Sequence, residues 1–155
     1  MLHPDQFAET DRLAELLDKK LSVVRELYNL ARRQSEVIGI GDLTRLMRVL
    51  AAKQTLLLEL QETEQSLAPY REQDPDQRQW KSDVVRQRAR QAAEDCERVL
   101  RETMLIERQC ETEMITRRDQ AAEQLQGAHS ATEARRAYGG EHGRDAARLD
   151  LTSES

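Results

Sequence analysis

Glycine is absent from the long segment between Asp42 and Gly127, and this absence restricts the fold more than any other feature of the chain. The only prolines in that segment, Pro69 and Pro75, lie close together and mark one short loop. Apolar residues recur every three to four positions on both sides of the loop, which is the pattern of amphipathic α-helices. The sequence therefore predicts an all-α fold built from a few long helices.

The first helix is expected at about residues 5–38. It should end at Gly39-Ile40-Gly41, because glycine accepts the left-handed conformation that follows many helices. Asp42 is then well placed to cap a second helix, at about residues 43–68, which Pro69 ends. The turn between the two helices is short, so we expect them to lie antiparallel.

The third helix is expected to start at Asp74-Pro75, where an acidic cap precedes proline at the first helical position. No breaker follows until Gly127, so this helix should cover residues 75–126. Beyond it the composition shifts to small and polar residues. The sequence thus predicts one helical domain over residues 1–126 and a disordered tail over residues 127–155.

Apolar seams indicate how the helices pack. The first helix has two seams and needs two neighbours. Their members are Leu13, Leu17, Val24, Tyr28, Ala31 and Ile38, and Leu16, Val23, Leu27 and Leu30. The second helix is expected to use one seam of Leu43, Leu46, Met47, Leu50, Leu57, Leu60 and Leu67. The seam expected on the third is Trp80, Val84, Ala92, Cys96, Val99, Thr103, Ile106, Cys110, Met114, Ala121 and Leu125. Because only 3% of the residues are aromatic, these thin seams predict an elongated antiparallel three-helix bundle or coiled coil with a long third helix.

The net charge and composition of the chain indicate its cellular compartment and the kinds of partner that it binds. The formal net charge is -5, and basic residues are interspersed with acidic ones, which argues against nucleic acid as a partner. No apolar run reaches the roughly 18 residues of a membrane span. The first five residues, Met-Leu-His-Pro-Asp, lack the pattern of a signal peptide, so we expect a cytoplasmic protein.

Residue types that carry catalysis are scattered. His3, His129 and His142 all lie in the predicted terminal segments, so no metal site, cofactor or catalytic residue is predicted, and we expect no enzyme activity. Cys96 and Cys110 lie on one stripe of the third helix, roughly 21 Å apart, which is too far for a disulfide between them. Buried packing is the predicted role of both thiols, and the alternative is an intermolecular or redox role.

The third helix is predicted to be about twice as long as the second. Its second half, about residues 102–126, should therefore extend beyond the turn between the first two helices. That segment carries Met104, Leu105, Ile106, Cys110, Met114 and Ile115. An exposed apolar stripe of this kind is typically a binding surface. The alternatives are that the third helix folds back on itself or that two copies of the chain pair there.

Four stretches in the first half of the chain resemble the FlgN family of flagellar export chaperones. They are Leu16-Leu17-Asp18-Lys19-Lys20-Leu21, Leu27-Tyr28-Asn29-Leu30-Ala31, Gly41-Asp42-Leu43 and Lys53-Gln54-Thr55-Leu56-Leu57-Leu58-Glu59-Leu60. The resemblance covers about residues 10–70. The resemblance consists of three features that follow one another along the chain: a Leu-rich charged helix, a Gly-Asp turn, and a second helix with a central polar pair.

The resemblance implies a cytosolic chaperone that holds the C-terminal helices of hook-associated proteins and delivers them to the flagellar type III export gate and ATPase complex. We expect the client to bind along the free part of the third helix, through Met104, Ile106, Cys110, Met114 and Leu125. Docking at the export apparatus is assigned to the apolar residues of the tail, Tyr138, Leu149 and Leu151.

Two other functions fit a charged helical chain of this size. One is a coiled-coil stalk or ATPase-associated subunit of the same export apparatus, which would have no client surface. The other is a generic dimeric coiled-coil adaptor. The chaperone is expected to be a monomer or a weak dimer.

Overall fold

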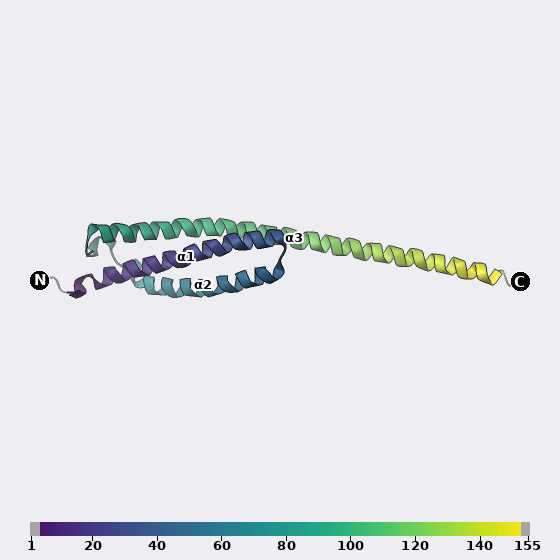
Figure 1. Ribbon diagram of the computed structural model, residues 1–155, viewed down its shortest axis with the longest axis horizontal. Helices are drawn as coiled ribbons and strands as arrows, with labels where there is room; N and C mark the ends of the chain where they lie inside the picture. Colours follow the sequence, from purple (N-terminus) through teal and green to yellow (C-terminus); the bar gives the residue numbers. More distant parts are fainter. Residues whose placement is uncertain (1–3, 153–155) are drawn as a thin grey trace. The chain divides into compact units, whose positions relative to one another are not determined.

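The computed structural model describes the backbone of residues 4–152 and the side chains of residues 6–140. Its elements are the 3-10 helix η1 (Pro4–Phe7), α1 (Ala8–Ile40), α2 (Leu43–Arg71), the 3-10 helix η2 (Pro75–Gln77) and α3 (Asp83–Thr152) (Figure 1). No strand occurs within these bounds, and the predicted all-α fold with a long third helix is confirmed. The chain comprises two compact units, Met1–Thr112 and Glu113–Ser155.

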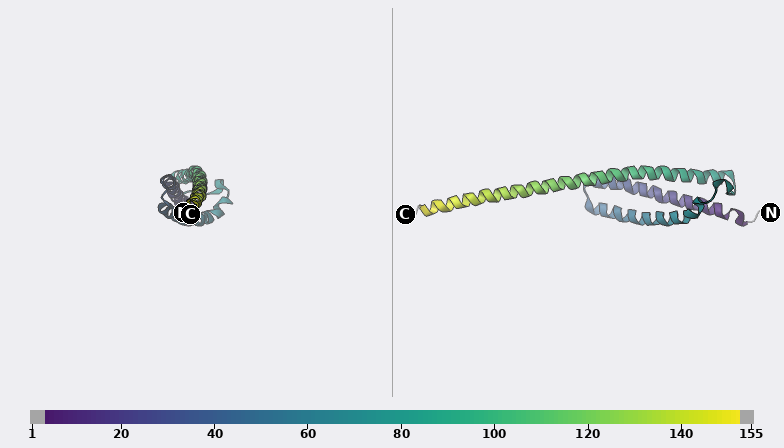
Figure 2. Two further views of the ribbon diagram at one scale, coloured as in Figure 1. Left: turned by 90° about the vertical axis from the view of Figure 1, so that its right-hand side faces the viewer. Right: turned by 180° about the vertical axis from the view of Figure 1, so that it is seen from behind.

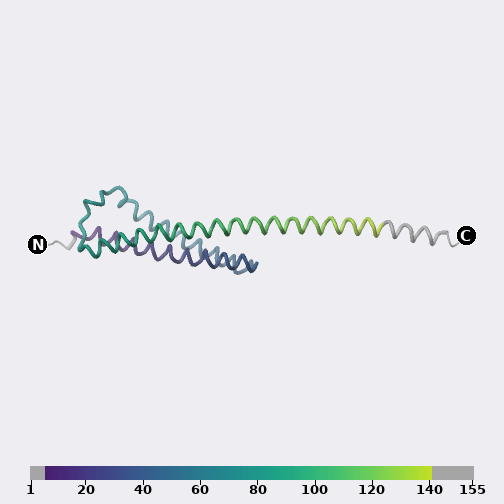
Figure 3. Tube along the Cα trace, turned by 90° about the horizontal axis from the view of Figure 1, so that it is seen from above, coloured from purple at the N-terminus to yellow at the C-terminus, as the bar shows by residue number. Residues whose placement is uncertain are grey.

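The first unit is an up-down-up bundle of α1, α2 and the first part of α3. Leu13 near the start of α1 contacts Leu67 near the end of α2, whereas Ile38 contacts Leu46 at the start of α2, so these two helices are antiparallel. Ile38 also contacts Cys110, and α3 therefore runs in the same direction as α1. The end-on view shows the helices at separate corners of a bundle (Figure 2), and Figure 3 shows the wide connection from α2 to α3.

α1 packs against two neighbours, as its two seams predict. On one side Val23 and Leu27 contact Leu56 of α2. On the other side Leu21 contacts Ala92 and Cys96 of α3. The central helix therefore contributes the largest share of the buried apolar side chains.

The turn between α1 and α2 has the predicted chemistry. Gly41 adopts a left-handed conformation with φ 81°, and its N–H donates to the carbonyl oxygens of Val37 and Ile38. A side chain at this position would be strained, because the Cβ of an L-residue clashes in that conformation. Asp42 then caps α2 by accepting a hydrogen bond from the backbone N–H of Arg45 at 3.1 Å.

Two predicted helix boundaries are wrong at the loop between α2 and α3. α2 continues through Pro69 to Arg71, since proline near a C-terminus removes only one helical N–H. The Asp74-Pro75 signal begins a single 3-10 turn, and the long helix begins at Asp83 instead of residue 75. Ser82 is its cap, with its hydroxyl accepting from the N–H of Val85.

The third helix also ends later than predicted. Instead of stopping at residue 126, α3 continues through Gly127 to Thr152. A single glycine costs a helix about 1 kcal/mol relative to alanine and does not forbid helical geometry. The flexibility predicted for residues 127–155 stays a prediction, and it is consistent with the full exposure of the side chains from 127 to 140.

Candidate partner-binding surfaces

The predicted client residues fall into two groups with different surroundings. Cys110 is 1% exposed and Ile106 is half-buried, and both pack against Val37, Ile38 and Leu46 of the bundle. The expectation that these two side chains lie on a free surface is therefore wrong. The bundle extends further along α3 than the sequence indicated, because α3 begins at Asp83 instead of residue 75, and Ile106 and Cys110 therefore lie level with Val37 and Ile38 at the end of α1.

Exposed apolar side chains are present on both sides of the unit boundary. In the first unit, Met104 and Leu105 are 54% and 59% exposed. In the second unit, Met114, Ile115, Leu125 and Tyr138 are all exposed.

All side chains of the second unit described from residue 114 to residue 140 are exposed. Within that segment Met114, Ala121 and Ala128 follow a seven-residue spacing, and Leu125 lies one turn after Ala121. This spacing gives one face of the helix a thin apolar stripe, which no described side chain covers. The side chains of Leu149 and Leu151, predicted to dock, lie outside the described residues.

A second exposed apolar stripe lies on α2, where the sequence predicted a buried seam. Leu46, Val49, Leu56 and Leu67 are buried, but several large apolar side chains of the same helix face solvent. They are Leu43, Met47, Leu50, Leu57 and Leu58, and we call this set the α2 stripe. The predicted seam mixed the two faces, since both repeat at intervals of three to four residues. The two faces differ by one residue, about 100° around a helix, and only packing against the other helices selects which of them is buried.

A polar layer crosses the bundle toward the end at which α1 turns into α2. Lys53 of α2 reaches Glu107 of α3, with its Nζ 2.7 Å from Oε2, and lies 3.4 Å from the Oε1 of Gln34 on α1. Lys53 belongs to the polar pair that interrupts the apolar seam of α2. The ion pair therefore links α2 and α3, and Gln34 joins it to α1.

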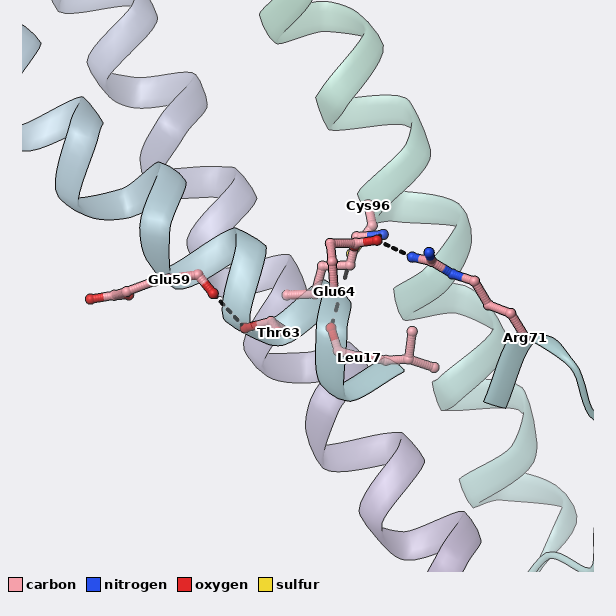
Figure 4. Close-up of polar contacts among 7 residues, drawn as sticks. Leu17, Glu59, Thr63, Glu64, Arg71 and Cys96 are labelled. Atoms are coloured by element: carbon pink, nitrogen blue, oxygen red, sulfur yellow. Dashed lines mark hydrogen bonds and ion pairs between the residues drawn. The ribbon is translucent and has the colours of Figure 1, made fainter. Parts of the chain in front are cut away.

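A second ion-pair group lies nearer the loop, between α1 and α2 (Figure 4). The Nζ of Lys20 is 2.6 Å from a carboxylate oxygen of Glu64, and Arg71 pairs with the other oxygen. Burial raises the pKa of Glu64, but hydrogen bonds from Lys20 and Arg71 outweigh this effect and hold that pKa below its usual value. This group favours a charged carboxylate and fixes the last turns of α2.

Cys96 shows the packing role predicted for the thiols. It is 1% exposed and points its Sγ toward the carbonyl oxygen of Leu17 at 3.9 Å (Figure 4). Burial raises the pKa of the Cys96 thiol, which keeps it protonated and lowers its reactivity. Cys110 is buried as well.

Metal-binding clusters and membrane-spanning helices are both absent from the described part of the chain. Among those residues no group of three or more His, Cys, Asp or Glu side chains is arranged to hold a metal ion. The helices described there also contain no segment long and apolar enough to cross a membrane.

Comparison with known protein families gives a match over the first half of the chain. The model of the FlgN family, described as FlgN protein, matches residues 1–73. These residues comprise α1, the Gly41 turn and α2. No curated protein sequence and no solved structure matches the chain. Over residues 1–73, somewhat less than half of its length, the chain is therefore similar to the FlgN family.

Proposed function

We propose that this protein is a cytoplasmic chaperone that binds hook-associated proteins through their C-terminal helices and delivers them to the flagellar type III export apparatus. The family match over residues 1–73 supports the general role. The observation that carries client binding is the exposed apolar stripe of the second unit, with Met114 and Leu125 as its largest members.

A helix without packed neighbours is a weak structure in water. Most helical stability in proteins comes from the packing of an apolar face, and isolated helices are marginal even when their intrinsic propensity is high. An amphipathic client helix would supply the missing face by lying along α3. Chaperone and client would then stabilise each other, and the apolar face of the client would be shielded before assembly.

The client contacts are assigned separately in each unit. Met104 is the proposed contact in the first unit, and Met114 and Leu125 are the proposed contacts in the second. Methionine suits this role because its flexible side chain adapts to different partners. We leave Ile106 and Cys110 out, since the bundle's own residues cover them. Docking at the export gate or ATPase complex through Tyr138, Leu149 and Leu151 stays a prediction.

Calorimetric titration of the full chain with the C-terminal segment of a hook-associated protein from the same genome tests the proposal. The double variant Met114→Asp/Leu125→Asp should bind about 100-fold more weakly, because two apolar side chains lose their burial against the client. Val84→Asp is the control, since Val84 is an exposed apolar residue of α3 that we do not assign to the client.

Two results would contradict this proposal. Unchanged affinity in the double variant would remove the second unit from the client site. A lack of binding by the unmodified chain would favour the stalk or ATPase-associated role instead.

A further inference from the structure

A cleft of about 410 Å³ lies beside the loop that connects α2 to α3, within the first unit. The apolar part of its lining consists of Leu13, Leu17, Trp80, Ala89 and Ala93. Trp80 is half-buried and packs against the apolar cluster around Leu13, so it joins the loop to the bundle. The cleft is therefore an apolar depression with room for one or two side chains of a partner.

Three arginine side chains line the same cleft. They are Arg78 of the loop and Arg86 and Arg90 of α3, and the only acidic residue in the lining is Asp76. Arg86 and Arg90 are four residues apart, so they lie on one face of α3 on successive turns. The cleft thus concentrates positive charge in a chain whose formal net charge is -5.

The chain itself engages these guanidinium groups only in part. Within the described residues, the only ion pair found for them joins Arg90 to Glu94 at 3.7 Å, one turn away on the same exposed helix face. Arg78 donates from Nη2 to the carbonyl oxygen of Tyr70 at 2.5 Å, but its Nε is buried and has no hydrogen-bond partner. A buried donor without an acceptor is unfavourable, and a carboxylate in the cleft would supply an acceptor.

Hydrogen bonds on both sides hold the loop around Arg78 in place. The buried Thr10 of α1 donates from Oγ1 to the carbonyl oxygen of Gln79 at 2.8 Å. The amide of Gln6 donates to the side chain of Gln79, also at 2.8 Å, and the bond from Arg78 to Tyr70 fixes the loop to the end of α2. The cleft therefore exists before a ligand arrives, and binding requires little further ordering of the loop.

We propose that this cleft binds an acidic segment of a partner protein, in which an apolar side chain is flanked by aspartate or glutamate. The apolar side chain lies against Trp80, and the carboxylates pair with Arg86 and Arg90, because the guanidinium fork matches a carboxylate at both oxygens. Nucleic acid fits less well, since a single short cleft offers no basic stripe that could follow a phosphate backbone. None of these residues is a proposed client contact, so the cleft does not rest on the proposed function.

Fluorescence of Trp80, the only tryptophan of the chain, reports binding in the cleft directly. We expect the full chain at low salt to bind the acetylated and amidated peptide Asp-Glu-Phe-Asp-Glu-Leu with a Kd of about 100 µM and a shift in Trp80 emission. The peptide Asp-Glu-Gly-Asp-Glu-Gly should bind at least about tenfold more weakly, because it has no apolar side chain to bury. The uncharged peptide Asn-Gln-Phe-Asn-Gln-Leu should also bind at least about tenfold more weakly, because it cannot pair with arginine.

Substitution of the arginines tests the charged half of the cleft. Arg86→Gln/Arg90→Gln should weaken binding of the acidic peptide about 30-fold, because two charge-assisted contacts are lost. Both side chains are exposed, so circular dichroism should show an unchanged helix content.

Arg88→Gln/Arg98→Gln is the matched control. It removes two positive charges from the same helix, at side chains that are 80% and 55% exposed and do not line the cleft. Its Kd should stay within about twofold of that of the unmodified chain, because salt screens charges that make no direct contact.

Three results would overturn the proposal. The first is an unmodified chain whose Trp80 emission does not respond to the acidic peptide up to about 5 mM. The second is an equal loss of affinity in Arg86→Gln/Arg90→Gln and in the control, which would reduce the effect to the overall charge of the chain. The third is displacement of the peptide by inorganic phosphate at concentrations near the Kd of the peptide, which would make the cleft a site for simple anions.

Discussion

Replacing Val24 with aspartate is expected to unfold the three-helix bundle at room temperature. Val24 is 0% exposed and lies at the centre of α1. Nearby residues of the same helix contact both partners: Leu21 packs against α3, and Val23 and Leu27 pack against α2. A carboxylate there would lose its hydration without gaining a partner, at a cost of several kcal/mol. That cost is a large part of the roughly 5–15 kcal/mol that holds a domain of this size folded.

Urea unfolding followed by circular dichroism measures this effect. The matched control is Val84→Asp, in which the same substitution is made at a residue that is 77% exposed. Its unfolding free energy should stay within about 0.5 kcal/mol of that of the unmodified protein. A Val24→Asp chain as stable as this control would show that the buried face of α1 has been assigned wrongly.

Removing Lys53 alone is expected to destabilise the bundle by about 2 kcal/mol. Lys53→Ala leaves the Glu107 carboxylate and the Gln34 amide without the ammonium group that joins them, in a layer where Lys53 and Glu107 side chains are only 22% and 30% exposed. The double variant Lys53→Leu/Glu107→Leu should recover this loss and reach at least the original stability, because the apolar seam then continues through the layer.

The unfolding free energy of the double variant, compared with that of Lys53→Ala, distinguishes two roles of this polar layer. Recovery means that the ion pair serves to align the three helices and adds little net stability. An exposed pair supplies the control: Arg88 and Asp18 approach only to 4.0 Å with side chains 80% and 52% exposed. Asp18→Ala should therefore change the unfolding free energy by less than about 0.5 kcal/mol. A double variant less stable than Lys53→Ala would contradict the predicted recovery.

Features that depend on neighbouring residues in the chain were predictable from the sequence. The turn at Gly41 and Asp42 follows from the left-handed preference of glycine and the capping ability of aspartate, which are local properties. The central position of α1 follows from its two apolar faces, because a helix with one neighbour needs only one. The family resemblance also rests on this region, and residues 1–73 are the segment that the FlgN family model matches.

Features that depend on tertiary packing were not predictable in the same way. The sequence could not decide between two interleaved sets of apolar residues on α2, since Leu46 and Met47 are equally apolar and only packing selects one of them. The residues at which the bundle stops covering α3 depend on where α1 ends in space. For that reason Cys110 was expected at a free surface and is part of the core.

The measurement that most directly tests the account is amide hydrogen exchange of the full chain with and without the hook-associated segment. In the unbound chain, amides of residues 114–140 should exchange much faster than those around Val24 and Cys96, because packed helices open only by global unfolding. On addition of the client segment, amides of residues 114–140 should become protected. Protection that appears only within the bundle, with residues 114–140 still exchanging freely, would contradict client binding by the second unit.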